Sequence, residues 1–273
     1  MVKVAAVQMQ PALMDKAFNL DKINRFARQA ADQGSQLAVF PECALTGYTL
    51  TKNEAASIAE PIPGPSSEAL TELCSELGVA IMVGTLEADD TGHLYNTAIL
   101  VDPGGLRVRY RKTHLPTLGV DRYLTPGDAL AAPIDTAFGR AGMLICYDLR
   151  FPEPARVLAL AGAQLILLST AWPRAARLYP DFIVSARAAE NHLYLVAANR
   201  IGEERGTTYL GRSIIADPNG HVLAQAEQND ETILFADIDP TTSDLKHRVF
   251  EPGEYELDLF NDRRPDLYTP LGS

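Results

Sequence analysis

Three side chains that could work together in acyl transfer follow three strand-like segments of this sequence. Glu42 follows the apolar run LAVF, Lys112 follows LRVRYR, and Cys146 follows MLI. A carboxylate can take a proton from a thiol, a thiolate can attack an electrophilic carbon, and an ammonium can stabilise the resulting oxyanion. Open α/β sheets place such groups beyond the carboxyl ends of strands, so we expect the three to meet around one cavity.

Each of these residues also has an ordinary structural explanation. A single cysteine after an apolar run is more often a small buried hydrophobe than a nucleophile. Cys74, on an apolar helical face, is interpreted in that way, and Cys43 is expected to pack behind the site. Glu42 and Lys112 could equally be surface charges. The residue types alone therefore leave the role of Cys146 open.

Short apolar runs alternate with helical patterns, which predicts an α/β fold with helices outside the sheets. Strands are expected at 2–9, 37–40, 79–88, 143–146, 165–170, 193–199 and 231–239. Helices are expected at about 20–33, 66–77, 154–161 and 181–191. The second helix would be capped by Ser66 or Ser67 after a Pro- and Ala-rich loop. The segments 96–112 and 211–227 predict β-hairpins, which argues against a purely parallel sheet.

The composition restricts the class of protein. With 273 residues, of which 47 % are apolar, the chain can form one α/β domain over 1–273, with a polar C-terminal arm at about 260–273. A net charge of −11 without clustered Lys and Arg argues against a nucleic-acid or anionic-membrane partner. Three cysteines lack the C-x-x-C spacing, and the first residues do not match a signal-peptide pattern. No apolar run approaches the ~20 residues that a membrane span needs. A cytoplasmic protein is expected.

The sequence around the three reactive groups resembles the nitrilase, or carbon–nitrogen hydrolase, superfamily. The matching stretches are VAAVQM, LAVFPECALTGY, YRKTHLP, LICYDLRFPE, RAAENHLYLVAANR, GRSIIADPNG and RRPDLY. The resemblance covers nearly the whole chain and implies a four-layer α-β-β-α sandwich. It makes Glu42 the general base, Lys112 the electrostatic stabiliser and Cys146 the nucleophile. The backbone N–H of Tyr147 would complete the oxyanion hole.

Three more residues are candidates for the site. Many members of the family carry a second glutamate at a position that falls near Val120 here, and the nearest carboxylate is Asp121. Asp121 could take over that role, or it could be a loop residue paired with Arg122. Tyr48 and Trp172 could shape the substrate pocket or could be ordinary aromatic packing.

Some polar residues near these motifs are interpreted as structural. Asn96 and His114 are expected to be structural. Buried or half-buried ion pairs that support the nucleophile turn are expected from four residues: Arg150, Glu153, Arg187 and Glu190. Nothing in the sequence resembles a zinc ligand set, so no metal or organic cofactor is expected.

The resemblance implies hydrolysis of a small carboxamide through a thioester, with release of ammonia, and the motifs look closest to the ω-amide branch. An N-carbamoyl amine or amino-acid hydrolase is the alternative. A nitrilase fits less well, because Tyr147-Asp148 stands where nitrilases commonly have Trp-Glu. A non-catalytic interaction protein is a further alternative. The family also implies a homodimer or larger homo-oligomer, with the C-terminal arm crossing to a neighbour.

Overall fold

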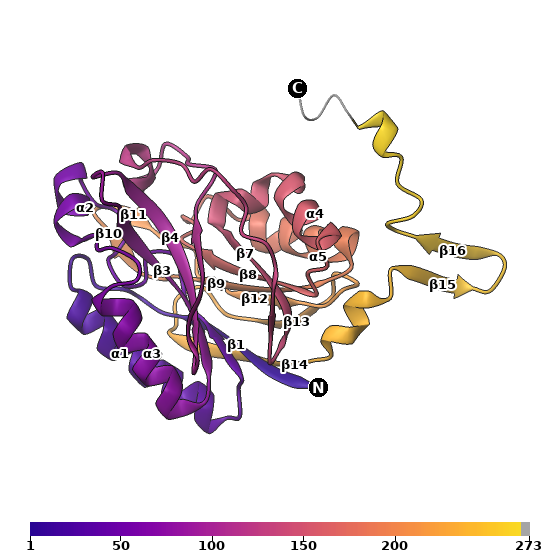
Figure 1. The fold of residues 1–273 in the computed structure, drawn as a ribbon, viewed down its shortest axis with the longest axis horizontal. Helices are drawn as coiled ribbons and strands as arrows, with labels where there is room; N and C mark the ends of the chain where they lie inside the picture. Colours follow the sequence, from indigo (N-terminus) through magenta and orange to yellow (C-terminus); the bar gives the residue numbers. More distant parts are fainter. Residues whose placement is uncertain (269–273) are drawn as a thin grey trace.

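The computed structural model describes residues 1–268, and within them two six-stranded sheets pack face to face (Figure 1). The first sheet contains, in spatial order, β14 (Thr232–Ile238), β1 (Val2–Gln8), β2 (Leu37–Val39), β3 (Ala80–Ala88), β4 (Leu94–Asp102) and β5 (Gly105–Arg111). The second contains β13 (Val222–Gln225), β12 (Ile214–Ala216), β9 (Tyr194–Asn199), β8 (Leu165–Thr170), β7 (Gly139–Ile145) and β6 (Ile134–Thr136).

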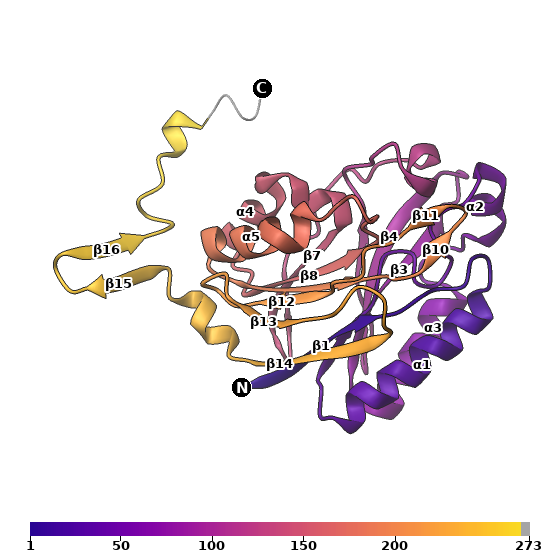
Figure 2. The same ribbon diagram turned by 180° about the vertical axis from the view of Figure 1, so that it is seen from behind.

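Helices cover the outer face of each sheet, as both ribbon views show (Figures 1 and 2). The first sheet carries α1 (Lys16–Asp32) and α3 (Pro65–Leu77), and the second carries α4 (Pro152–Leu160) and α5 (Val184–Asn191). The order of layers is therefore helix, sheet, sheet, helix. This confirms the expected α-β-β-α sandwich.

The alternation of side chains in β1 shows why its central part, Val4 to Val7, is apolar without a break. Val4 and Ala6 pack into the core between the sheets, whereas Ala5 and Val7 pack against the side that α1 and α3 cover. Ile23 of α1 belongs to that second cluster. A strand that is buried on both faces needs a continuous apolar run instead of an alternating one.

The central strands of each sheet are parallel, so their carboxyl ends lie at one edge. β1, β2 and β3 run parallel in the first sheet, as do β7, β8 and β9 in the second. The two edges are hydrogen-bonded to each other. Ser169 Oγ donates to the Phe40 carbonyl oxygen at 2.8 Å, and the Glu42 N–H donates to the Thr170 carbonyl oxygen at 3.2 Å.

A short helix, α2 (Lys52–Ile58), replaces part of the loop that the Pro- and Ala-rich composition predicted. Its N-cap Thr51 accepts from the Glu54 N–H, and the Glu54 side chain accepts from the Thr51 N–H. This reciprocal capping box satisfies two otherwise unpaired donors. The Thr-x-x-Glu pattern was readable in the sequence, and the loop prediction was wrong here.

The starts of two other helices also differ from expectation. The N-cap of α3 is Gly64, not Ser66 or Ser67, because Pro65 takes the first helical position, where no N–H is needed. Ser67 Oγ instead accepts from the Gly64 N–H at 2.8 Å. The helix expected from about 181 begins with a π-helical turn, η3 (Tyr179–Ile183), and continues as α5.

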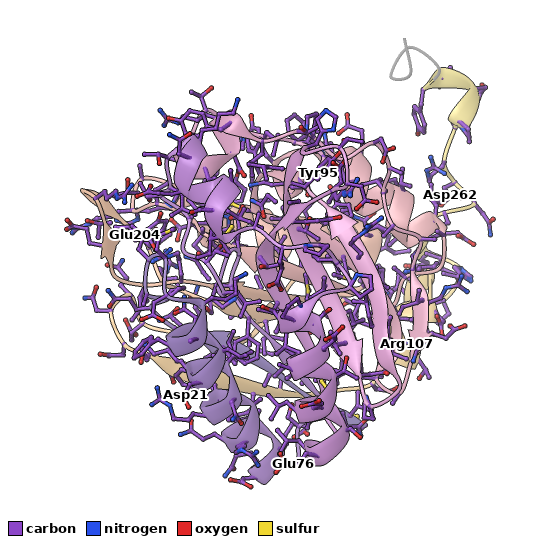
Figure 3. The ribbon with its side chains drawn as sticks, turned by 60° about the vertical axis from the view of Figure 1, so that its left-hand side comes forward. Asp21, Glu76, Tyr95, Arg107, Glu204 and Asp262 are labelled. Atoms are coloured by element: carbon purple, nitrogen blue, oxygen red, sulfur yellow. The ribbon has the colours of Figure 1, made fainter. Side chains whose placement is uncertain are left out.

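The last described part of the chain leaves the sandwich as a projecting arm. After η4 (Pro240–Asp244), a hairpin of β15 (His247–Glu251) and β16 (Tyr255–Asp258) extends away from both sheets, and η5 (Pro265–Leu267) follows (Figures 1 and 2). Asp262 lies off the body of the molecule (Figure 3). The projecting segment thus begins before the expected residue 260, and residues 269–273 lie outside the described residues. No helix in residues 1–268 is long and apolar enough to cross a membrane.

Candidate active site

The structure brings Glu42, Lys112 and Cys146 together at the joined edge of the two sheets. Glu42 follows β2, Lys112 follows β5, and Cys146 follows β7. Lys112 Nζ lies 2.6 Å from Glu42 Oε1, and both side chains are fully buried. The charges of Glu42 and Lys112 both act on the Cys146 thiol, which is itself 5 % exposed. A carboxylate, an ammonium and a thiol thus share one closed site.

Asp121 is also part of this site. It lies on the short helix η1 (Gly119–Tyr123), and its Oδ2 is 2.5 Å from Lys112 Nζ. The same oxygen accepts from the Tyr48 hydroxyl at 2.8 Å. Arg122, the alternative partner, instead donates to the Gly119 carbonyl oxygen. Lys112 is therefore held between two carboxylates, Glu42 and Asp121.

Asn96 links the two carboxylates, and the sequence interpretation missed this contact. Its Nδ2 donates to Glu42 Oε1 at 2.7 Å and to Asp121 Oδ1 at 2.8 Å. Asn96 lies in β4 and is fully buried. The position of Asn96 in a largely apolar segment was the sequence signal for such a contact, because a buried amide needs polar partners.

Cys146 lies on a tight turn that neighbouring polar groups hold in place. Cys146 has a φ of 44°, a left-handed conformation that is uncommon for a residue with a side chain. It begins η2 (Cys146–Arg150) directly after β7. Asp148 Oδ2 accepts from the Ile145 N–H at 3.0 Å, and Oδ1 accepts from the His114 N–H at 3.0 Å. Such a conformation persists only where the surroundings fix it.

Arg187 supports the same turn from α5. Arg187 Nη1 lies 3.1 Å from Glu190 Oε1, and Arg187 Nε donates to the Leu149 carbonyl oxygen at 3.2 Å. This agrees with the ion pair expected for Arg187 and Glu190. Arg150 and Glu153 are instead exposed, and among the described residues neither forms an ion pair, so that part of the expectation was wrong. Within residues 1–268, no group of three or more His, Cys, Asp or Glu side chains is arranged to hold a metal ion.

Burial and charge set the protonation of the three groups. Burial raises the pKa of the Cys146 thiol well above its ordinary value, the Glu42 charge adds to this, and Lys112 and the Ala171 N–H oppose it. Burial also raises the pKa of Glu42, against the opposing charge of Lys112. Burial alone would lower the pKa of Lys112, but the charges of Asp121 and Glu42 raise it well above its ordinary value. The resting thiol is therefore protonated, beside a permanent ammonium.

Two buried polar atoms of this region lack a hydrogen-bond partner within the described 268 residues: Glu42 Oε2 and Trp172 Nε1. Trp172 is fully buried, and its ring stacks on Tyr179 with centroids 5.1 Å apart. The preceding N–H, that of Ala171, interacts with the Cys146 sulfur. A buried polar group without a partner costs about 1–3 kcal/mol. Glu42 thus keeps a free acceptor beside the thiol, and Trp172, the residue after Ala171, keeps a free donor.

Comparison with known proteins gives one consistent family. The family described as "Carbon-nitrogen hydrolase" matches residues 3–247. A protein named nitrilase from Pyrococcus abyssi is 39 % identical over 98 % of this chain and 99 % of its own. Omega-amidase NIT2 from Mus musculus is 33 % identical over 98 % of this chain and 96 % of its own.

A solved amidase from Nesterenkonia sp. AN1 has the same fold. It superposes with a TM-score of 0.82 at 25 % identity, covering 99 % of this chain and 100 % of its own. That structure shows acrylamide added to the active-site cysteine of a variant. The match over residues 3–247, the full-length relatives and the shared sandwich agree, and this chain belongs to the carbon–nitrogen hydrolase family.

Proposed function

We propose that this enzyme hydrolyses the amide bond of a small carboxamide through a thioester and releases ammonia, in the manner of an ω-amidase. The main support is the geometry of Glu42. One of its carboxylate oxygens contacts Lys112, and the other has no partner in residues 1–268; the Glu42 charge also acts on the Cys146 thiol. Relatives named omega-amidase, at 32–34 % identity, support the choice of substrate class.

The first step forms a carbon–sulfur bond. Glu42 Oε2 takes the thiol proton as the Cys146 sulfur attacks the carbonyl carbon of the amide. Because burial raises the pKa of the thiol, attack depends on a base that removes the proton during the step. Because burial also raises the pKa of Glu42, the carboxylate can accept that proton more readily than an exposed glutamate.

The oxyanion that forms is stabilised by Lys112 and by the backbone N–H of Tyr147. The raised pKa of Lys112 keeps it an ammonium, so its charge is present before reaction begins. The Tyr147 N–H belongs to the first turn of η2, where N–H groups have no partner within the turn. Asp121 acts on Lys112 and not on substrate, because its oxygens already contact Lys112, Tyr48 and Asn96.

The second half of the reaction regenerates the thiol. Glu42 returns its proton to the amide nitrogen, the carbon–nitrogen bond breaks, and ammonia leaves. Water then gives a proton to Glu42 and attacks the thioester, and the carboxylic acid departs as the proton returns to sulfur. Trp172 Nε1 is the proposed donor to the acyl part of the substrate. Tyr48 acts through Asp121, since its hydroxyl already donates there.

Replacement of the nucleophile tests this proposal. Cys146→Ala should abolish ammonia release across a panel of aliphatic amides, ω-amides, carbamoyl compounds and nitriles, while the enzyme stays folded. Cys74→Ala is the matched control, because Cys74 packs between α3 and the first sheet. Full activity of Cys146→Ala would refute the assignment, and activity on carbamoyl compounds or nitriles alone would refute the substrate class.

The enzyme is further proposed to be a cytoplasmic homo-oligomer. Support for the oligomer comes from exposed apolar side chains on the projecting arm: Leu245, Val249, Phe250, Tyr255 and Leu257. Exposed apolar side chains gathered on one segment are typical of an interaction surface. Support for the compartment comes from three free thiols, which a reducing environment preserves.

A further inference from the structure

A buried carboxylate outside the catalytic group holds the loop that follows Glu42. Glu204 lies on a small hairpin of β10 (Glu203–Glu204) and β11 (Thr207–Thr208), next to α2 (Figures 1 and 3). It is 5 % exposed, and its Oε2 accepts from the Tyr48 N–H at 3.0 Å and from the Thr49 N–H at 2.9 Å. One carboxylate oxygen therefore fixes two consecutive peptide groups.

The negative charge of Glu204 is balanced by Arg200. Arg200 Nη1 lies 2.6 Å from Glu204 Oε1, and the Arg200 side chain is fully buried at the end of β9. The guanidinium also lies 4.0 Å from the ring centroid of Tyr209, whose hydroxyl is 2.8 Å from Thr49 Oγ1. Glu204 and Tyr209 thus each contact both the loop, at Tyr48 and Thr49, and the Arg200 guanidinium.

Tyr48, whose N–H is held by Glu204, contacts the Asp121 segment through two hydrogen bonds. Its carbonyl oxygen accepts from the Val120 N–H at 2.9 Å, and its hydroxyl donates to Asp121 Oδ2 at 2.8 Å. Gly119 packs so closely that a Cβ there would lie 2.3 Å from Tyr48 Cε1. The position of η1, which carries Asp121, is therefore set by Tyr48.

We propose that Glu204 is a positioning residue for the hydrolysis, because it fixes Tyr48 and through it Asp121 and the Lys112 ammonium. The inference rests on the proposed function for its rate effect. The ammonium must lie where the oxyanion forms, and a displacement of about 1 Å at a reacting group can cost about 10²-fold in rate. Glu204 touches no reacting atom itself, and its effect passes through Tyr48.

Fold stability alone does not explain a charged pair at this place. A buried ion pair is often no more stabilising than well-packed apolar residues of similar volume. The hairpin also has an independent attachment, because Arg205 Nη2 lies 2.6 Å from Glu54 Oε1 of α2. What Glu204 adds is an acceptor for the Tyr48 and Thr49 N–H groups.

The test compares two variants that both lack the buried charges. Arg200→Met/Glu204→Gln keeps an acceptor for the two N–H groups, and Arg200→Met/Glu204→Ala removes it. We expect the Ala form to lose about 10- to 100-fold in kcat with little change in KM, and the Gln form to stay near the wild type. Arg205→Gln, which removes the surface attachment of the same hairpin, should leave kcat unchanged.

The pH profile of Cys146 alkylation by iodoacetamide separates positioning from a loss of folded protein. Lys112 lowers the pKa of the thiol, so displacing Lys112 should move the profile to higher pH in the Ala form only. Equal kcat and equal profiles in the Ala and Gln forms would overturn the inference, as would an equal loss in Arg205→Gln.

The alkylation assay needs no turnover, so the two proposals can fail separately. If the wild type released no ammonia from any amide while the Ala form still moved the profile, the proposed function would fail and the positioning role would stand. Conversely, ammonia release by the wild type with an unmoved profile in the Ala form would reject positioning alone.

Discussion

The two carboxylate oxygens of Glu42 have different surroundings, because one is hydrogen-bonded and the other is not. Oε1 accepts from Lys112 Nζ at 2.6 Å and from Asn96 Nδ2 at 2.7 Å. Oε2, although buried, has no partner in the described part of the chain. One oxygen thus fixes the side chain, and the other stays available to move a proton.

The acid limb of the pH profile should report Glu42. In the proposed mechanism activity needs the ionised Glu42 carboxylate. Because burial raises the pKa of Glu42, kcat/KM should fall as pH drops through a value above the ~4.3 of a free glutamate. The Asn96 hydrogen bond lowers this pKa, so Asn96→Ala should move the limb to higher pH. A profile with its limb at or below the free value would contradict this assignment.

Lys112 should matter for stability as well as for rate. Lys112→Met leaves Glu42 and Asp121 buried without their cation, which we expect to cost about 3–5 kcal/mol of unfolding free energy. Activity should fall by at least ~10²-fold. Lys112→Met/Asp121→Asn, with one charge fewer, should recover part of the stability but none of the activity. Denaturant unfolding and ammonia release measure the two effects.

The instability of Lys112→Met should itself depend on pH. Without the ammonium, nothing opposes the burial that raises the pKa of Glu42, so this carboxyl binds a proton more tightly in the folded state than in the unfolded state. Its penalty is therefore absent below the unfolded pKa, about 4, and grows as pH rises toward the raised folded value. Unfolding free energies of Lys112→Met and wild type should converge as pH falls toward 4. A gap that stays constant from neutral pH downward would contradict this.

Some residues of this site were predictable from the sequence and others were not, for a physical reason. Glu42, Lys112 and Cys146 each follow a strand, so local pattern and family resemblance both pointed to them. Asn96 was misjudged because its partners, Glu42 and Asp121, reach it only through the fold. The two interpretations of Asp121 could not be separated either, since its contact with Lys112 depends on where η1 packs.

At the scale of elements, β3 needs a glycine where the chain turns after β2. A Cβ at Gly84 would lie 2.5 Å from the Cys43 nitrogen and 2.7 Å from Glu42 Cα. Both neighbours are backbone atoms, so no side-chain rotation relieves the clash. The close approach of β3 to the turn after β2 therefore fixes the position of the Glu42 backbone in the site.

Gly84→Ala should push the Glu42 turn away from β3. We expect about 1–3 kcal/mol of destabilisation from overpacking, and at least ~10-fold lower kcat because the base is displaced. Gly104→Ala, in the turn between β4 and β5, is the control, since its Cβ would meet only Asp102 Oδ1, at 3.1 Å. Thermal unfolding and steady-state kinetics of both variants measure the effect. Normal turnover by a folded Gly84→Ala enzyme would contradict it.

Strands and long helices were predictable because each carries its own periodic pattern. The hairpins at 96–112 and 211–227 formed as expected, since their Gly-containing turns specify the connection locally. The short helices η1 and α2 were missed. Residues of η1 depend on Tyr48 for their position, and α2 has only seven residues, too few for a clear period.

At the scale of the whole molecule, the division into two sheets was not readable from periodicity. It depends on long-range pairing, such as the parallel contact of β1 with β2 and the hydrogen bond from Ser169 to Phe40 across the sheets. The four-layer architecture was predicted from the family resemblance. The same long-range bonds bring the strand ends together, so the sandwich and the site form as one structure.

The projecting arm should hold the proposed oligomer together. The rings of Phe250 and Tyr255 stack with centroids 4.7 Å apart, and both side chains are 52 % exposed on a hairpin outside the sandwich. If a second copy covers them, Phe250→Glu/Tyr255→Glu should dissociate the oligomer without unfolding the sandwich, because charges there would be costly to bury. Phe18→Glu, on α1, should leave the assembly unchanged. Sedimentation at micromolar concentration distinguishes these results, and a monomeric wild type would exclude the proposed assembly.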